Sequence, residues 1–281
     1  MLTEDLPVGG YEWMTPDEID RVDWRTLDTR RADTGYVLMV DLDYDPAAFV
    51  RHETFPLAPE SIPITEEMLS PLSLSYLDSF GQRGTLNSTR LTSHFLPRTK
   101  YVVHCRNLAY YLRNGMRLVR VHHAIRFRQA PFLNSFMKFI SDKKAATNDP
   151  FQRKLLKLYL NSVYGKFILN KLRFVECSVI STDGDRVRKL ASRPNFESFR
   201  LLNESSALIF RKPGKVVLDT MVAIGFSILD LSKLYVASQV HDEIIPRLGG
   251  PDRCSVIYTG KAFIFICICQ KHNNYFFSSR H

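Results

Sequence analysis

The 281-residue sequence lacks paired cysteines, a long apolar run and a recognisable targeting segment. Its five cysteines are odd in number and none are spaced as C-x-x-C, so neither a zinc site nor a disulfide scaffold is indicated. The longest apolar run, residues 262–269, is far shorter than the roughly 20 residues that span a membrane. The first residues have neither the basic nor the apolar region of a signal peptide. We therefore expect a reduced, intracellular protein of nucleus or cytoplasm, without a membrane partner.

Acidic residues are fewer than basic ones: the sequence has 29 Asp and Glu and 38 Lys and Arg, which gives a formal net charge of +9. The 45% apolar and 12% aromatic residues can bury a sizeable core, which excludes a disordered chain. The length allows one large or two ordinary domains. A basic surplus of this size suits a nucleic-acid surface, although many basic proteins bind none.

Residues 149–166 have the pattern of a helix with a defined start. Asp149 is suited to cap the free amides, Pro150 to the first helical position and Gly165 to the exit. At about 100° per residue, one arc carries five apolar residues that predict a packed face: Leu155, Leu156, Tyr159, Leu160 and Val163. The opposite arc carries a cation, an amide and an aromatic ring in a row: Lys157, Asn161 and Tyr164.

Such a row has a use in nucleotide binding. A nucleoside triphosphate needs positive charge at its phosphates, a polar group near its sugar and a flat surface beside its base. Gly165 has no side chain, so a base pair can approach the backbone closely there. The alternative is an ordinary amphipathic helix with solvated lysines, which composition alone favours.

The order Lys157-x-x-x-Asn161-Ser162-x-Tyr164-Gly165 resembles motif B of family B DNA polymerases, K-x3-N-S-x-Y-G. More specifically, the chain resembles the protein-primed type found in linear plasmids, bacteriophages and Maverick/Polinton-like mobile elements. The resemblance covers most of residues 1–259 and implies an α+β fold, a partial right-hand polymerase with palm strands and helices and a fingers helical hairpin. It also implies template-directed addition of deoxynucleotides with Mg²⁺, on a DNA primer-template and with a terminal priming protein as a further partner.

The resemblance divides the chain into five segments. They are a partial palm (1–55), an insertion between motifs A and B that contacts DNA or the priming protein (56–130), fingers with the motif B helix (131–172), palm (173–259) and an aberrant tail (260–281). Residues 56–100 are rich in proline and serine and predict an irregular excursion or linker.

By the resemblance, Lys157 holds phosphate, Asn161 lies near the sugar and primer terminus, and Tyr164 and Gly165 face the nascent base pair. A second cation before the motif helix helps to hold the triphosphate in this family. Lys143 and Lys144 are the candidates, the alternative being that they are solvated. Eight further cations are expected to contact DNA, or else to be solvated charges on the surface: Arg106, Arg117, Arg120, Arg126, Arg128, Lys166, Lys212 and Lys215.

Elsewhere the pattern predicts strands and helices of ordinary length. The predicted strands are 36–43, 100–104, 117–128, 174–180 and 207–210, and the predicted helices are 16–22, 106–115, 131–146 and one from 224 to near 241. Within the last of these helices, Asp230 is expected to be a cap or a buried partner.

Asp41, Asp43 and Asp45 follow with period two at the end of a predicted strand. On a strand they face one side, where they either share Mg²⁺ or form a solvated polar face. The resemblance favours the polar face, because a strand like Val40-Asp41-Leu42-Asp43-Tyr44, followed by Pro56-Leu57-Ala58-Pro59-Glu60, lies just after motif A in these polymerases. The chain therefore begins too late to contain motif A.

The resemblance stops at the position of motif C, Y-x-D-T-D-S. It holds through Tyr258-Thr259, Gly260 stands where the first aspartate is expected, and residues 260–281 contain no Asp or Glu. An aspartate codon begins with G. If an intron splits this codon after its first base and the message is translated without splicing, the G followed by the start of the intron, GTAAG, encodes Gly-Lys, the pair found at Gly260-Lys261. We interpret residues 260–281 as translated intron, the alternative being a genuine β-strand.

The combined expectation is a polymerase fragment that lacks the exonuclease domain and the metal-binding aspartates of motifs A and C. It then has no catalytic residue or metal site of its own and does not extend a primer by itself. Three alternatives stay open: a non-catalytic nucleic-acid-binding remnant, a decayed product with an exposed apolar tail, and a basic α+β protein unrelated to polymerases.

Overall fold

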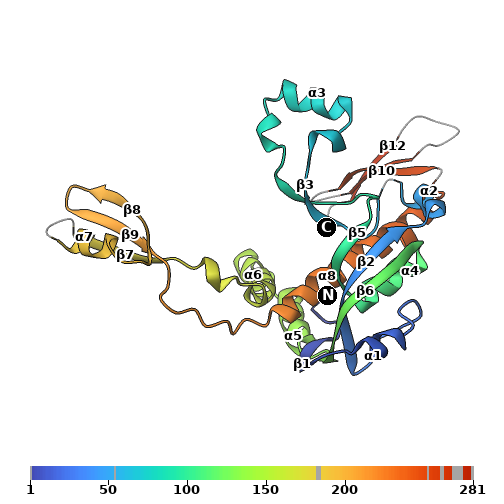
Figure 1. The fold of residues 1–281 in the computed structure, drawn as a ribbon, viewed down its shortest axis with the longest axis horizontal. Helices are drawn as coiled ribbons and strands as arrows, with labels where there is room; N and C mark the ends of the chain where they lie inside the picture. The colour runs from blue at the N-terminus through green and yellow to red at the C-terminus, as the bar shows by residue number, and fades with distance from the viewer. Residues whose placement is uncertain are drawn as a thin grey trace. The chain divides into compact units, whose positions relative to one another are not determined.

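The computed structural model describes residues 2–53, 55–181, 185–251, 253–259, 263–267 and 275–279, and from residue 254 onward only the backbone. The chain has a mixed α+β fold, as the sequence predicts, and divides into two compact units (Figure 1). Unit 1 contains residues 1–134 and 227–281, and unit 2 contains residues 135–226.

A curled antiparallel sheet forms the centre of unit 1. Its strand order is β1 (Leu6–Trp13), β6 (Met116–Ala130), β2 (Thr34–Tyr44) and β5 (Arg98–His104). β2 alternates buried and partly exposed residues, the period-two pattern of a strand with one face in a core. The core side chains of β2 pack with those of helix α4 (Cys105–Arg113), whose Leu108 and Tyr111 are buried.

Further helices flank this sheet, of which the sequence predicts the first and the last but not the second. They are α1 (Pro16–Asp20), which begins with a Thr15–Glu18 capping box, the short α2 (Phe49–His52), and α8 (Val222–Ser238). α8 continues through a π-helical segment (Gln239–Ile244) into α9 (Ile245–Arg247), beyond its predicted end near residue 241. Gly115 ends α4 with a φ of +96°, and a Cβ there would lie 2.3 Å from the Cβ of Ala48.

The segment predicted as an irregular linker is instead partly ordered. β3 (Glu60–Pro63) pairs antiparallel with β4 (Thr89–Thr92), and α3 (Pro71–Ser79) lies between them in sequence. Ser70 caps α3 and Pro71 occupies its first turn, so the residues that suggested a loop define a helix start.

Unit 2 contains a helical hairpin and a small sheet. The helices are α5 (Asn134–Ala146) and α6 (Pro150–Phe167). The sheet has the order β7 (Glu176–Ser181), β9 (Ser206–Arg211) and β8 (Phe196–Asn203), and α7 (Arg186–Ala191) packs on its core. β8 and α7 are elements that the sequence analysis did not predict.

The compact units cross the predicted segment boundaries. β5 and β6, from the predicted insertion, pair with β2, from the predicted partial palm. Residues 173–226 belong to unit 2, whereas residues 227–259 belong to unit 1. The predicted segments follow the order of the polymerase-like motifs along the chain, and that order does not show which distant strands pair with one another.

The chain beyond α9 contributes a second antiparallel sheet, β10 (Cys254–Thr259), β11 (Phe263–Cys267) and β12 (Tyr275–Ser279). The pairing agrees with the β-propensity of these residues. The interpretation of residues 260–281 as translated intron stays a prediction, and Gly260 and Lys261 lie outside the described residues.

Asp230 is a buried partner, one of the two roles predicted for it. It is 1% exposed, and its Oδ2 accepts a hydrogen bond of 2.8 Å from the backbone N–H of His104. Its Oδ1 lies 3.2 Å from Nζ of Lys233, and its carbonyl accepts a hydrogen bond of 2.7 Å from Asn107. These contacts join α8 to the junction of β5 and α4.

Two buried histidines of unit 1 are held neutral. Burial lowers the pKa of His52 to about 3, and nearby His241 and Arg51 lower it further. Burial also lowers the pKa of His104 to about 3, with a smaller contribution from Arg106. Both side chains are fully buried.

We expect unit 1 to lose stability as the pH falls below about 6.5. The unfolded histidines bind protons there, whereas the folded ones stay neutral down to about pH 3. Between pH 7.5 and 5.5, each of these histidines should therefore lower the free energy of unfolding by about 1.4 kcal/mol. Urea unfolding at the two pH values measures this.

The variant His52→Leu should show a smaller drop, because it removes one of the histidines whose pKa burial lowers. His123→Ala is the matched control, since it removes an exposed histidine of the same unit. A midpoint independent of pH in the unmodified chain would contradict the assignment of two neutral buried histidines.

Candidate nucleic-acid interface

Helix α6, which carries the polymerase-like motif, begins as predicted. Asp149 is its N-cap, and its carboxylate accepts a hydrogen bond of 2.9 Å from the N–H of Phe151. Pro150 occupies the first turn. The predicted helix end is wrong by two residues, because α6 continues through Gly165 to Phe167.

The predicted packed face of α6 is only half formed. Leu156, Leu160 and Val163 are partly buried, as expected for a packed arc. Leu155 and Tyr159 are exposed, and no residue of α6 is fully buried. A periodic pattern identifies which residues share an arc but not whether another element covers it.

Lys157 and Asn161 line one hollow on the surface of α6. The hollow is also lined by Phe151, Lys154, Leu155 and Leu158. Phe151 is 72% exposed and Leu158 is 63% exposed, so cations and apolar surface are presented together. The structure thus brings together two of the predicted nucleotide-binding residues, separated by one helical turn.

Tyr164 and Gly165 do not line this hollow. Both are partly buried. A Cβ built on Gly165 has no atom of another segment within 4 Å, so the space beside this glycine is open. Packing does not require a glycine at this helical position.

The two candidate cations that precede α6 lie in the last turn of α5. Nζ of Lys143 lies 4.7 Å from the centroid of the Phe139 ring, a cation–π contact within the helix. Lys144 is partly buried. Neither lysine forms an ion pair within the described part of the chain.

Asp41, Asp43 and Asp45 have separate partners. Asp41 lies 2.8 Å from Nε2 of His122 and accepts a hydrogen bond from the N–H of Lys100. Asp43 pairs with Arg117 at 2.9 Å, and Asp45 caps the 3₁₀ turn at Pro46–Ala48. The three carboxylates therefore do not fit a shared Mg²⁺ site. Among the described residues, no three His, Cys, Asp or Glu side chains are grouped to hold a metal ion.

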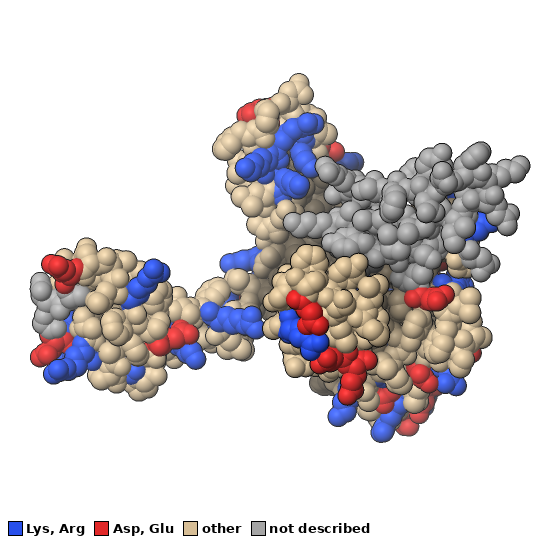
Figure 2. All heavy atoms as spheres, turned by 90° about the horizontal axis from the view of Figure 1, so that it is seen from above, with Lys and Arg blue, Asp and Glu red and all other residues tan. Residues whose placement is uncertain are grey.

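Three of the five predicted DNA-binding arginines of unit 1 are engaged in ion pairs. Arg117 contacts Asp43, Arg126 contacts Glu12 and Glu18, and Arg106 contacts Glu4. Arg120 and Arg128 are exposed and form no ion pair within the residues that the structure describes. Figure 2 shows basic and acidic side chains interspersed over unit 1 on the face in view.

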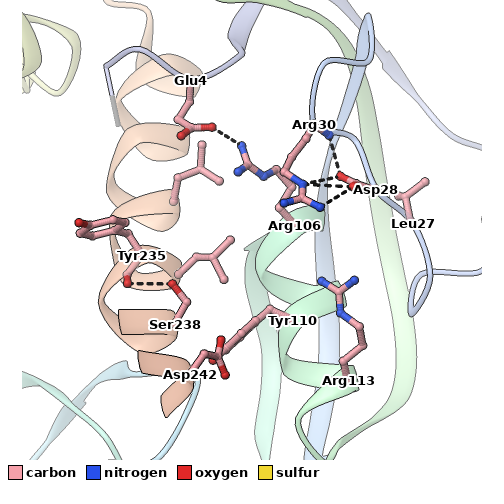
Figure 3. Close-up of a pocket in the computed structure, with 12 residues that line it drawn as sticks. Glu4, Leu27, Asp28, Arg30, Arg106, Tyr110, Arg113, Tyr235, Ser238 and Asp242 are labelled. Atoms are coloured by element: carbon pink, nitrogen blue, oxygen red, sulfur yellow. Dashed lines mark hydrogen bonds and ion pairs between the residues drawn. The ribbon is translucent and has the colours of Figure 1, made fainter. Parts of the chain in front are cut away.

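Arg106 lies in a cleft of unit 1 between α4, α8 and residues 27–30 (Figure 3). Two further arginines line the cleft: Arg30, which pairs with Asp28, and Arg113. The carboxylates Glu4, Asp28 and Asp242 line it as well. Because three acidic groups offset three guanidinium groups, this cleft has no net positive charge.

In unit 2, Lys166, Lys212 and Lys215 are exposed. Lys215 lines a second hollow, which contains two cations that the sequence analysis did not single out, Lys171 and Arg173. Lys154, in the hollow on α6, was also missed. Residues 166–173 contain three cations, and this local density of positive charge was a signal that could have identified Lys171 and Arg173.

Comparison of the chain with protein-family models gave no match, and neither did comparison with curated proteins or with solved structures. None of the helices in the described ranges combines the length and the apolar character needed to cross a bilayer.

We expect opposite effects from alanine at the two helical glycines of unit 2. Gly165→Ala should stabilise the chain by about 1 kcal/mol, because alanine favours the helix and nothing obstructs its Cβ. Gly225→Ala in α8 should destabilise it, because a Cβ there would lie 2.4 Å from Cγ2 of Ile168. Urea unfolding followed by far-UV circular dichroism measures both, and a loss of stability with Gly165→Ala would show that this glycine has a structural role.

Proposed function

We propose that the chain is a fragment of a protein-primed family B DNA polymerase. In this proposal α5 and α6 form the fingers hairpin, and unit 1 supplies palm strands and helices. Its ligands are deoxynucleoside triphosphates and a DNA primer-template, with a terminal priming protein as a further partner. The intact enzyme adds deoxynucleotides under the direction of a template.

The observation that carries the proposal is the placement of Lys157 and Asn161 in one open hollow on α6. The cation and the amide lie one helical turn apart, in the order of the K-x3-N-S-x-Y-G motif. A lysine ammonium supplies a point charge for a triphosphate, and the amide can donate to and accept from a sugar hydroxyl.

The open space beside Gly165 supports the same proposal. Glycine in a helix interior costs about 1 kcal/mol relative to alanine, and packing does not require it here. Close approach of a base pair to the backbone would explain the residue.

Asp41, Asp43 and Asp45 each contact a different group of the chain, so the structure does not bring these three carboxylates together. At the motif C position the sequence has Gly260-Lys261 in place of aspartate. These observations also favour the second candidate function, a non-catalytic nucleic-acid-binding remnant of such a polymerase.

The variant Lys157→Ala should weaken binding of a fluorescent deoxynucleoside triphosphate by about tenfold or more. A hydrogen bond to a charged group contributes about 1.5–3 kcal/mol, and this variant removes one of the two cations that line the hollow, leaving Lys154. Fluorescence titration of the full chain measures the dissociation constant.

The matched control for Lys157→Ala is Arg153→Ala. Arg153 is exposed on the same helix but does not line the hollow. Equal weakening by both variants would mean that the nucleotide responds only to net charge, and the assignment of α6 as the nucleotide-binding helix would be wrong.

We expect no primer extension by this chain with Mg²⁺ and deoxynucleotides. The two motif C aspartates that the resemblance implies are absent, since the sequence has Gly260 and Ala262 at their positions. Gel analysis of a labelled primer-template measures extension. Products that disappear in the Lys157→Ala variant would show that the chain is an active polymerase despite this sequence.

A further inference from the structure

We propose that unit 2 has a binding site for single-stranded nucleic acid in its neck, which we define as residues 171–175 and 213–217. These two segments connect the helical part of unit 2 to the sheet β7-β9-β8 and back to α8 (Figure 1). The inference rests on the proposed function, since it identifies where the chain holds an unpaired strand.

Both segments of the neck line one hollow. Its walls are Lys171 with residues 173 to 176 on one side and Pro213 with residues 215 to 217 on the other. Two ion pairs connect the outgoing and returning segments. Lys171 contacts Asp219, and Arg211 contacts Glu176 at 3.4 Å. The hollow is therefore bordered by contacts that hold its two sides together.

The charge of the neck favours an anionic ligand. Lys171, Arg173 and Lys215 line the hollow, and Glu176 is the one carboxylate among its lining residues. Glu176 is already paired with Arg211. Arg173 and Lys215 are exposed and have no ion-pair partner within the described ranges, so their charges are available to phosphate.

The neck also offers an aromatic ring beside these cations. Phe174 is 45% exposed and lies next to Arg173 in the sequence, and Val217 is 58% exposed on the opposite segment. Base stacking on an aromatic side chain, combined with cations that follow the backbone, is the usual way in which proteins bind single strands. A duplex keeps its bases stacked on one another, so Phe174 cannot stack on them without melting the duplex.

The cleft of Figure 3 is a weaker candidate for the same ligand. Three arginines and three carboxylates line it, so it provides no net charge for a phosphate backbone. The neck has the cationic surplus and the exposed ring together.

The test is fluorescence anisotropy of a labelled oligo(dT) titrated with the full chain at several salt concentrations. The double variant Arg173→Ala/Lys215→Ala should weaken binding by about tenfold and reduce the slope of log K against log salt by about 1.4, about 0.7 for each lost contact. Phe174→Ala should weaken binding by about fivefold or more and leave the salt slope unchanged.

Matched controls come from the same unit. Arg188→Ala/Lys189→Ala removes two exposed cations of α7, and Phe199→Ala removes an exposed ring of β8. None of these residues lines the neck. If the control and neck variants weaken binding equally, the neck is not the site, although the chain still binds DNA as the proposed function requires.

Two other outcomes overturn the inference in different ways. If an unlabelled duplex of the same length competes as well as oligo(dT), the neck does not select single strands. If the unmodified chain binds neither oligonucleotide, the DNA-binding part of the proposed function fails together with the inference. Wild-type binding with selective loss in the neck variants supports both.

Discussion

A buried carboxylate, that of Asp230, connects parts of unit 1 that are 126 positions apart in the sequence. Burial raises the pKa of this carboxyl, whereas the ammonium of Lys233 and the backbone N–H of His104 favour the charged form. Because an unpaired buried charge is costly, α8 must keep its register against β5 and α4. The contact holds α8 against the end of β5, an edge strand of the sheet that also contains β6.

A second buried charge, Arg98, holds the base of the segment that contains α3. Arg98 is 1% exposed, and its guanidinium donates to the carbonyl oxygens of Ala58, Leu57, His94 and Leu96. These backbone acceptors lie before β3 and after β4, so one side chain closes the loop between them. The contact explains why a region rich in proline and serine is ordered at its base.

The structure separates charges that serve the fold from charges that are available for a ligand. In unit 1, Arg106, Arg117 and Arg126 neutralise acidic side chains of other segments. In unit 2, Lys157, Arg173 and Lys215 line hollows without an ion-pair partner in the described part of the chain. This contrast is the physical basis for placing the proposed nucleotide and single-strand contacts in unit 2.

Local patterns in the sequence determined the start of α6, the strands β2 and β6 and the helix α4, because caps and hydrophobic periodicity act within a few residues. They did not determine that Leu155 and Tyr159 are exposed, since burial of a face requires another element to lie against it. Nor did they show that Arg126 would pair with Glu12 and Glu18, more than 100 positions away. Strand pairing between distant segments placed Asp43 beside Arg117 and Glu12 beside Arg126. Such contacts depend on the path of the whole chain, so only the tertiary structure decided which charges remain available.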